Sequence, residues 1–284
     1  MSERLLWVTG AGGLIGSQFV RIASTLAPHW CVRGLGRGEL DLTDTDAIRR
    51  FFATEKPAAI IHCAAMSKTP ACQADPPLAR RINVEATTLL SELAAEIPFI
   101  FFSTDLVFDG RKGDYDEAAA PQPLNVYGET KAEAEQVVLR HPRHTVIRTS
   151  LNGGASPTGD RGFNEETRNA LRSGRTLNLF TDEFRNPIAA LVTAHAVTEL
   201  LQRGVSGLFH IAGSERLSRW EIGQLLVARW GEGASQLRAG SLRDYTGAAR
   251  APDTTLNCAK ARSLLSFPLP KFTEWLRDHP AEPF

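Results

Sequence analysis

The stretch Arg4-Leu-Leu-Trp-Val-Thr-Gly-Ala-Gly-Gly-Leu-Ile-Gly16 decides the fold of this chain of 284 residues. A short apolar run, a glycine-rich turn and apolar residues at helical spacing follow one another, which predicts a strand, a tight turn and a helix. Gly10, Gly13 and Gly16 lack side chains where the backbone must turn, approach a pyrophosphate and pack helix on strand. The stretch therefore predicts a dinucleotide site that includes Leu14 and Ile15, with a plain strand-to-helix turn as the alternative.

Strand and helix patterns alternate up to about residue 150, which indicates βαβ units and a parallel sheet. Further strands are predicted at residues 31–35, 58–61, 98–102 and 145–148, and helices at residues 44–52, 78–96 and 127–139. Beyond residue 150 a glycine-rich segment leads to predicted helices at residues 163–173 and 219–230. We expect an α/β fold, a Rossmann-type doubly wound parallel sheet with a smaller C-terminal substrate lobe. Residues 1–150 form the NAD(P)-binding domain in this prediction, and residues 151–284 form mainly the substrate lobe.

Tyr127 and Lys131 are four residues apart in a predicted helix and so share one face. A lysine cation beside a tyrosine hydroxyl favours the phenolate and lowers its pKa, which suits proton transfer at neutral pH. Thr104 follows a buried strand, at the sheet edge where ligands bind in open α/β folds. The three side chains are predicted to converge on one carbonyl oxygen, although a chance pair of surface residues is the alternative for Tyr127 and Lys131.

Another buried strand leads into His62 and then Cys63, Ala64 and Ala65, which we assign to the cofactor site. His62 is predicted to be a hydrogen-bonded residue at the strand end and Cys63 an inert thiol. The four cysteines form no C-x-x-C pair and no metal spacing, so no metal site is predicted. Asn83 either bonds to backbone near the active-site strand or is an ordinary helix residue.

These motifs together resemble the extended short-chain dehydrogenase/reductases, most closely the dTDP-4-dehydrorhamnose reductase branch. The matching segments are residues 9–16, 40–44, 61–65, 103–110, 123–131, 147–150 and 187–188, and the C-terminal third matches more loosely. The resemblance implies hydride transfer between a nicotinamide and a C=O/CH–OH pair, and a small lobe from which residues near 208–212 return to the main sheet.

The resemblance also implies roles for single residues. Tyr127 donates the proton, Lys131 lowers its pKa and holds the nicotinamide ribose, and Thr104 binds the carbonyl oxygen. Asp105 contacts the substrate, unless it is a capping residue. Asp41 and Leu42 lie near the adenine, unless Asp41 is a solvated turn residue.

Two departures from the family pattern bear on cofactor and substrate. No carboxylate lies between Trp30 and Arg37, where an acid usually binds the ribose of NAD, and the Arg37 guanidinium suits a 2′-phosphate. We therefore predict that NADP(H) is preferred and that NAD(H) is also accepted. Leu151 stands where an aromatic residue usually contacts the sugar.

The leading hypothesis is an NAD(P)H-dependent reductase of a nucleotide-linked 4-keto-6-deoxysugar. The alternatives are a related oxidoreductase with another carbonyl substrate, an NAD-dependent sugar-nucleotide epimerase or dehydratase, and a non-catalytic dinucleotide-binding subunit like that of methionine adenosyltransferase. With 32 basic and 32 acidic residues and no basic run, we expect no nucleic-acid partner. We expect no membrane-spanning segment and a cytoplasmic location. The protein could also form a homodimer.

Overall fold

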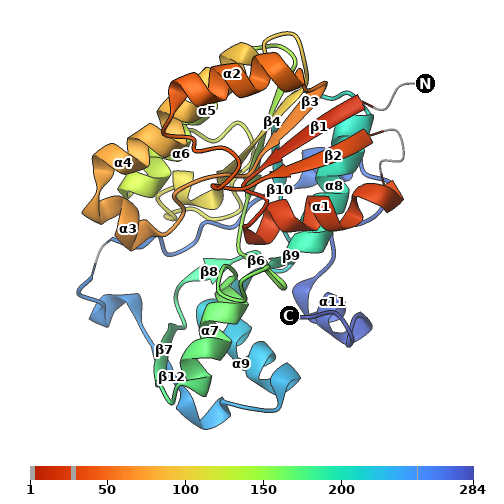
Figure 1. The fold of residues 1–284 in the computed structure, drawn as a ribbon. Coiled ribbons are helices and arrows are strands. Elements are labelled where there is room, and N and C mark those ends of the chain that lie inside the picture. The colour runs from red at the N-terminus through yellow and green to blue at the C-terminus, as the bar shows by residue number, and fades with distance from the viewer. Residues whose placement is uncertain (1–3, 27–29, 248) are drawn as a thin grey trace.

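A parallel sheet forms the centre of the larger lobe in this computed structural model, which describes residues 4–26, 30–247 and 249–284 (Figure 1). Its six strands are ordered β10-β5-β4-β3-β1-β2, and every neighbouring pair is parallel. The strands are β1 (Arg4–Thr9), β2 (Trp30–Leu35), β3 (Ala59–His62), β4 (Phe99–Thr104), β5 (His144–Thr149) and β10 (Gly207–Ile211). The strand order reverses between β1 and β3, and such switch points are where open α/β sheets bind ligands.

Helices cover both faces of the sheet because successive strand residues point to opposite sides. Val8 packs with residues of α1 (Leu14–Leu26) and α8 (Ala190–Gln202) on one face. Its neighbour Trp7 packs on the other face with residues of α2 (Thr45–Glu55), α5 (Ala86–Leu93) and α6 (Val126–Val138). The prediction of a doubly wound α/β fold is confirmed.

The helix predicted over residues 78–96 is divided into pieces. α3 (Thr69–Ala74) and α4 (Pro76–Arg80) precede a π-helical turn, η1 (Arg81–Glu85), before α5 begins. The Asp75 carboxylate caps α4 by accepting from the Leu78 N–H at 3.0 Å. π-helical turns often occur at functional sites, and this one contains Asn83.

The smaller lobe lies beyond the carboxyl end of the sheet (Figure 1). It contains α7 (Phe163–Arg172), α9 (Arg219–Trp230), the parallel pair β7 (Leu177–Phe180) and β12 (Leu237–Gly240), and the antiparallel pair β8 (Phe184–Arg185) and β11 (Leu217–Ser218). Ser218 and Glu221 form a capping box at the start of α9, and Gly231 ends the helix in the left-handed conformation. Leu171, Val227 and Leu237 are buried between these elements.

Short segments join the two lobes. β6 (Asn152–Gly153) pairs with β9 (Ile188–Ala189). Near the C-terminus follow α10 (Ala259–Arg262) and α11 (Phe272–Asp278). The 3₁₀ turns are η2 (Asp105–Val107), directly after β4, and η3 (Ala234–Gln236) and η4 (Leu242–Asp244). β10 pairs with β5 in register Leu208↔Val146, so residues 207–211 form part of the main sheet. The boundary at residue 150 stays a prediction.

Candidate functional site

Thr104 and Tyr127 come from neighbouring elements at the carboxyl edge of the sheet. Thr104 ends β4, and its hydroxyl accepts the Leu106 N–H at 3.1 Å and so caps η2. Tyr127 is the second residue of α6, which begins after Asn125, whose side chain accepts the Gly128 N–H at 3.0 Å. The Thr104 side chain is close enough to the Tyr127 hydroxyl to lower its pKa by hydrogen bonding, although burial and the Asp105 charge raise this pKa by more.

Gly128 lets α6 approach the turn after β4 closely enough to bring these two residues together. A Cβ at this position would overlap the Leu106 carbonyl oxygen and would also lie 2.9 Å from the Pro123 side chain. Sequence reasoning did not single out this glycine. Its signal is a glycine directly after Tyr127, where a helix former would otherwise be favoured.

Lys131 lies one turn after Tyr127 and is 2 % exposed. Its ammonium is 3.9 Å from the centroid of the Phe101 ring. Burial lowers the Lys131 pKa to about 7, although Glu135 and the nearby thiols favour the charged form. The Lys131 amino group is therefore only partly protonated at neutral pH.

The direction of the Tyr127 pKa differs from the prediction. Burial raises it, the Asp105 charge raises it further, and Lys131 does not offset these effects. The physical reason is that burial of the Tyr127 hydroxyl penalises the charged phenolate by more than the hydrogen bond with Thr104 favours it. Tyr127 is consequently protonated at neutral pH, which is the form that donates a proton.

The glycine turn has the backbone shape of a phosphate cradle. Gly10 has φ +69°, and a Cβ there would lie 2.7 Å from the Ala64 nitrogen. The Gly13 N–H donates to the Gly10 carbonyl at 2.8 Å, and a Cβ on Gly16 would overlap that same carbonyl. α1 begins at Leu14, followed by Ile15, so the positive end of the helix faces this turn.

The end of β3 closes the other side of the turn. The Cys63 N–H donates to the Thr9 carbonyl at 3.2 Å, and the Ala64 N–H donates to the Thr9 hydroxyl at 3.3 Å. Burial raises the Cys63 pKa far above its ordinary value, in agreement with an inert thiol. His62 contacts the hydroxyls of Thr9 and Thr87 at 2.7 and 3.0 Å through its two ring nitrogens, as predicted for a hydrogen-bonded strand end. Burial lowers its pKa to about 3.

Asn83 fixes the segment that follows Ala65. Its amide accepts the Met66 N–H at 2.8 Å, donates to the Met66 carbonyl at 3.1 Å and donates to the Thr130 hydroxyl at 3.1 Å. Of the two interpretations of Asn83, the bond to backbone near the site is the one observed. Through Thr130 it also holds the helix that bears Tyr127 and Lys131.

The residues after β2 form an exposed turn. Arg37 is exposed, and its charge adds to the hydrogen bonds from Thr43 that lower the Asp41 pKa. Asp41 accepts from the Thr43 N–H at 2.9 Å, as a turn residue does, and Leu42 lies between them, half-buried. Arg33 points away from this turn, because it pairs with Glu55 on α2 at 3.1 Å.

Glu39 is a carboxylate at this turn that sequence reasoning missed. It lies beyond residues 30–37, but its side chain folds back and accepts the Gly36 N–H at 2.9 Å. An acid therefore does stand beside the end of β2, next to Arg37. The spacing Gly36-x-x-Glu39 was the available signal.

Both carboxylate oxygens of Asp105 accept hydrogen bonds. Oδ1 accepts from Thr104 at 3.2 Å, while Oδ2 accepts from Ser150 and Thr254 at 2.8 Å each and lies 3.6 Å from the Arg185 guanidinium. These bonds tie β4 to the smaller lobe. Substrate contact by Asp105 stays a prediction.

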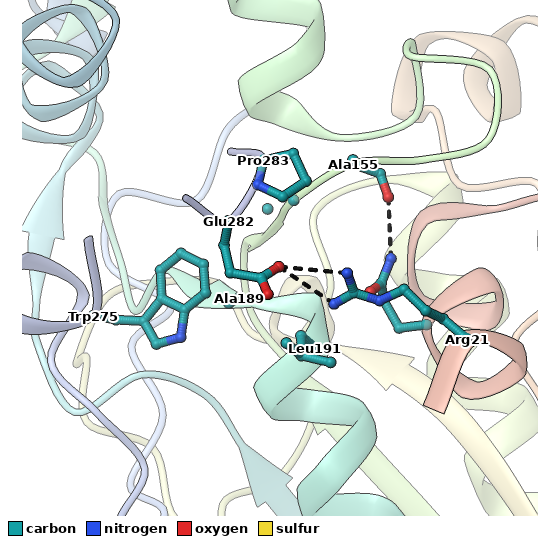
Figure 2. A pocket seen from close by; sticks show the side chains of 10 residues that line it. Arg21, Ala155, Ala189, Leu191, Trp275, Glu282 and Pro283 are labelled. Carbon is teal, nitrogen blue, oxygen red and sulfur yellow. Dashed lines mark hydrogen bonds and ion pairs between the residues drawn. The ribbon is translucent and has the colours of Figure 1, made fainter. Parts of the chain in front are cut away.

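A small cavity lies away from these residues, beneath the C-terminal segment (Figure 2). It measures about 90 Å³ and is lined by Gln18, Arg21, Gly154, Trp275 and Glu282 among others. Arg21 pairs with Glu282 at 3.4 Å, and Gln18 donates to the Ala155 carbonyl at 3.0 Å. None of the predicted catalytic residues lines this cavity.

Within the described ranges, no cluster of three or more His, Cys, Asp or Glu side chains is arranged to hold a metal ion. No helix in those ranges has the length and apolar character needed to cross a membrane.

Comparison with known proteins gives a family match over almost the whole chain. The family model described as "RmlD substrate binding domain" matches residues 4–282. A probable low-salt glycan biosynthesis reductase of Haloferax volcanii is 32 % identical over 261 residues, which cover 87 % of each chain. Methionine adenosyltransferase 2 subunit beta of Mus musculus is 28 % identical, over 93 % of this chain and 83 % of that protein.

Solved structures share the fold. A dTDP-4-dehydrorhamnose reductase from Bacillus anthracis in complex with NADP has a TM-score of 0.88 at 23 % identity, with 98 % of each chain covered. A hypothetical dTDP-4-dehydrorhamnose reductase from Sulfolobus tokodaii has a TM-score of 0.82 at 30 % identity, over 94 % of this chain and 96 % of that one. A dTDP-glucose 4,6-dehydratase from Streptomyces venezuelae with NAD bound has a TM-score of 0.78 at 21 % identity, over 96 % of this chain and 97 % of that one.

Proposed function

The chain belongs to the RmlD substrate binding domain family, and from this premise we propose that it reduces a nucleotide-linked 4-keto-6-deoxysugar with NAD(P)H. The observation that supports a reductase most directly is the approach of Tyr127 to Thr104, with the buried Lys131 one turn further along the same helix. This group lies at the carboxyl edge of the sheet, at the same edge as the glycine turn.

A dinucleotide fits the residues around that turn. Gly10 and Gly16 have no room for side chains and Gly13 has little, which leaves backbone to meet a pyrophosphate at the start of α1. When bound, the nicotinamide would supply the hydride. Lys131 would hold its ribose, and Asp41 and Leu42 would lie near the adenine.

The preference for NADP(H) over NAD(H), with only modest discrimination, is retained in this proposal. Arg37 is exposed and free to bind a 2′-phosphate. Glu39 lies next to it and would repel the same phosphate while accepting ribose hydroxyls of NAD(H). We therefore expect modest discrimination between the two cofactors.

Tyr127 acts as the proton donor in the proposed reaction. Its raised pKa keeps the hydroxyl protonated, so it can protonate the oxygen of the carbonyl as negative charge develops there. Thr104, already hydrogen-bonded to the turn after β4, would bind the same oxygen and polarise the carbonyl.

The test is steady-state oxidation of NADPH and NADH with dTDP-4-keto-6-deoxysugars, in the wild type and in Tyr127→Phe. The phenyl ring keeps the packing but removes the proton donor, so kcat should fall about 10²–10⁴-fold with cofactor affinity nearly unchanged. A near-normal rate in Tyr127→Phe would exclude this residue as the donor. An epimerase would interconvert sugars without net consumption of the reduced cofactor.

A second candidate is supported by the 28 % identity to methionine adenosyltransferase 2 subunit beta. A chain with that kind of role would bind a dinucleotide and a partner protein. It would show cofactor binding without turnover of any keto-sugar nucleotide, and this outcome of the same assay would favour it.

A further inference from the structure

Glu135 is a buried carboxylate one helical turn beyond Lys131 on α6. Tyr127, Lys131 and Glu135 follow one another at intervals of four residues, so they are neighbours along one side of the helix. Lys131 and Glu135 are each 2 % exposed. A buried carboxylate is unfavourable unless other groups compensate for its charge, so the groups around Glu135 indicate what it does.

Arg148 of β5 is the hydrogen-bonded partner of this carboxylate. Its Nε donates to Oε1 of Glu135 at 2.9 Å and its Nη2 donates to Oε2 at 2.7 Å, with both side chains almost fully buried. The Arg148 guanidinium also lies 4.9 Å from the centroid of the Phe108 ring, and its Nη1 is 3.4 Å from Nε2 of His210. These contacts hold the Glu135 carboxylate from the side of β5.

The Lys131 ammonium lies over a different strand. Its Nζ is 3.9 Å from the centroid of the Phe101 ring on β4. Among the residues that the structure describes, neither a hydrogen bond nor an ion pair engages this ammonium. Burial lowers the Lys131 pKa, and the charge of Glu135 is the largest effect that opposes burial. Glu135 therefore acts on Lys131 through space, from one turn away on the same helix.

The other titratable groups around Lys131 carry no charge at neutral pH. Burial raises the pKa of the Cys63 and Cys72 thiols, so both stay protonated. Burial lowers the pKa of His62 to about 3, so its ring is neutral. The Tyr127 hydroxyl is protonated for the same reason as the thiols. None of these four groups can compensate for the buried ammonium.

Charged side chains on the other elements packed against α6 are exposed or engaged by other groups. They are Arg80 on α4, Arg81 and Glu85 on η1, Glu92 on α5, and Asp105 in η2. Among the described groups that act on Lys131, only Glu135, in its ion pair with Arg148, is charged. The protonation of Lys131 therefore depends on Glu135.

We propose that Glu135 is a positioning residue of the site, whose buried charge keeps Lys131 in the ammonium form, and that Arg148 holds this carboxylate in place. The proposal rests on the proposed function, which assigns Lys131 to the nicotinamide ribose. A neutral amine would still donate to a ribose hydroxyl. Only the ammonium adds a positive charge beside the oxygen of Tyr127 as its proton leaves. Glu135 acts through Lys131 and does not itself touch the substrate.

The protonation of Lys131 is measured directly by NMR titration of the full chain, free of dinucleotide and labelled with ¹³C at the Cε atoms of lysine. The chain has six lysines, and the other five are exposed: Lys56, Lys68, Lys112, Lys260 and Lys271. Only the Lys131 signal should titrate near pH 7. The exposed lysines should titrate near their ordinary value of about 10.4. Loss of one signal in Lys131→Met assigns it.

In the double variant Glu135→Leu/Arg148→Met the titration midpoint of Lys131 should fall by about one pH unit, because the favourable charge is lost while burial remains. Replacing both partners of a buried pair by apolar side chains leaves no uncompensated charge and is often neutral for stability. Glu135→Gln/Arg148→Gln makes the same prediction with polar side chains, should the apolar pair not fold. Glu135→Asp keeps the charge, so its midpoint should lie closer to the wild type than to the double variants.

The matched control removes an ion pair from the exposed side of the same helix. Arg80 Nη2 donates to Oε1 of Glu133 at 2.6 Å, and solvent reaches both side chains. Glu133→Gln/Arg80→Gln should leave the Lys131 midpoint within about 0.2 pH units of the wild type, because solvent screens these charges. Thermal unfolding shows that each variant is folded before it is titrated.

The second measurement is the pH profile of NADPH oxidation with a keto-sugar nucleotide. The limb at which kcat/KM falls as Lys131 loses its proton should move to lower pH by the same amount as the midpoint. A merely structural role of Glu135 would lower the rate at every pH and leave this limb in place.

Two results would overturn the proposal. One is an unchanged Lys131 midpoint in a folded double variant, and the other is an equal shift in the Glu133→Gln/Arg80→Gln control. Failure of the proposed reductase is a separate outcome, because the NMR titration requires no turnover. A shifted midpoint in a chain that reduces no keto-sugar would keep the role of Glu135 and reject the reaction.

Discussion

Lys131→Met should stabilise the dinucleotide-free protein while abolishing turnover. The lysine is 2 % exposed, and burial lowers its pKa from 10.5 to about 7. At about 1.4 kcal/mol per pKa unit this corresponds to about 5 kcal/mol of unfavourable free energy for the charged form. Relaxation of the site makes the actual cost of the buried charge smaller than this. We therefore expect Lys131→Met to raise the free energy of unfolding by about 2–4 kcal/mol at pH 6.5.

The pH dependence of this stability difference tests whether burial of the Lys131 charge causes it. Below about pH 7 Lys131 is charged in both the folded and the unfolded chain, so its full burial cost is present. Between about pH 7 and 10.5 the unfolded chain binds more protons at this site, so the stability of the wild type rises with pH. The advantage of Lys131→Met should therefore shrink by about 2 kcal/mol between pH 7 and 8.5.

Urea unfolding of both proteins at pH 6.5, 7 and 8.5 measures these differences. Lys112→Met, at an exposed loop position, is the control and should change the free energy of unfolding by less than about 0.5 kcal/mol. If Lys131→Met is no more stable than the wild type at pH 6.5, or if its extra stability does not depend on pH, burial of the Lys131 charge does not destabilise the protein as argued.

The remaining predictions concern the cofactor site and the position of α6. Gly13→Leu should weaken NADPH binding at least about ten-fold in calorimetry, because even a Cβ there would lie 3.1 Å from a carbonyl oxygen of the same turn; wild-type affinity would rule out this turn as the phosphate cradle. Gly128→Ala should lower kcat about 10- to 100-fold with little change in cofactor Kd, because its Cβ would push the helix away from Leu106. If the alanine instead stabilises the protein at full activity, as helix propensity alone would favour, the close approach is not needed. Arg37→Ala should raise the Kd of NADPH about ten-fold and leave that of NADH unchanged, whereas Glu39→Gln should tighten NADPH binding. Equal Kd values for the two cofactors in the wild type would contradict the Arg37 assignment.

Features set by local sequence were predictable, and the helix over residues 219–230 is the clearest case. Its limits match the prediction because Ser218 and Glu221 form the capping box and Gly231 supplies the left-handed C-cap. The strand–turn–helix unit around the three glycines follows from the same kind of local signal.

Features set by contacts between distant segments were not predictable. The helix expected over residues 78–96 contains a π-helical turn where Asn83 bonds to Met66 and Thr130, and no local pattern indicates those partners. The raised pKa of Tyr127 depends on how deeply the folded chain surrounds the hydroxyl. Likewise, Glu39 reaches the end of β2 only because the turn folds back on itself.

The place of β10 at the sheet edge governs the order in which the protein can assemble. β5 carries Arg148, which is buried in an ion pair with Glu135 of α6, and β10 covers the open side of that strand. Residue 211 must therefore be synthesised before β10, the last strand of the sheet in chain order, can pair fully with β5. Until then the nascent chain presents β5 as an unprotected edge, which is a site for aggregation or for chaperone binding. Part of the smaller lobe (α7, β7 and β8) precedes β10 in the chain, so completion of the sheet requires synthesis of that part, whereas β11, α9 and β12 follow the last strand.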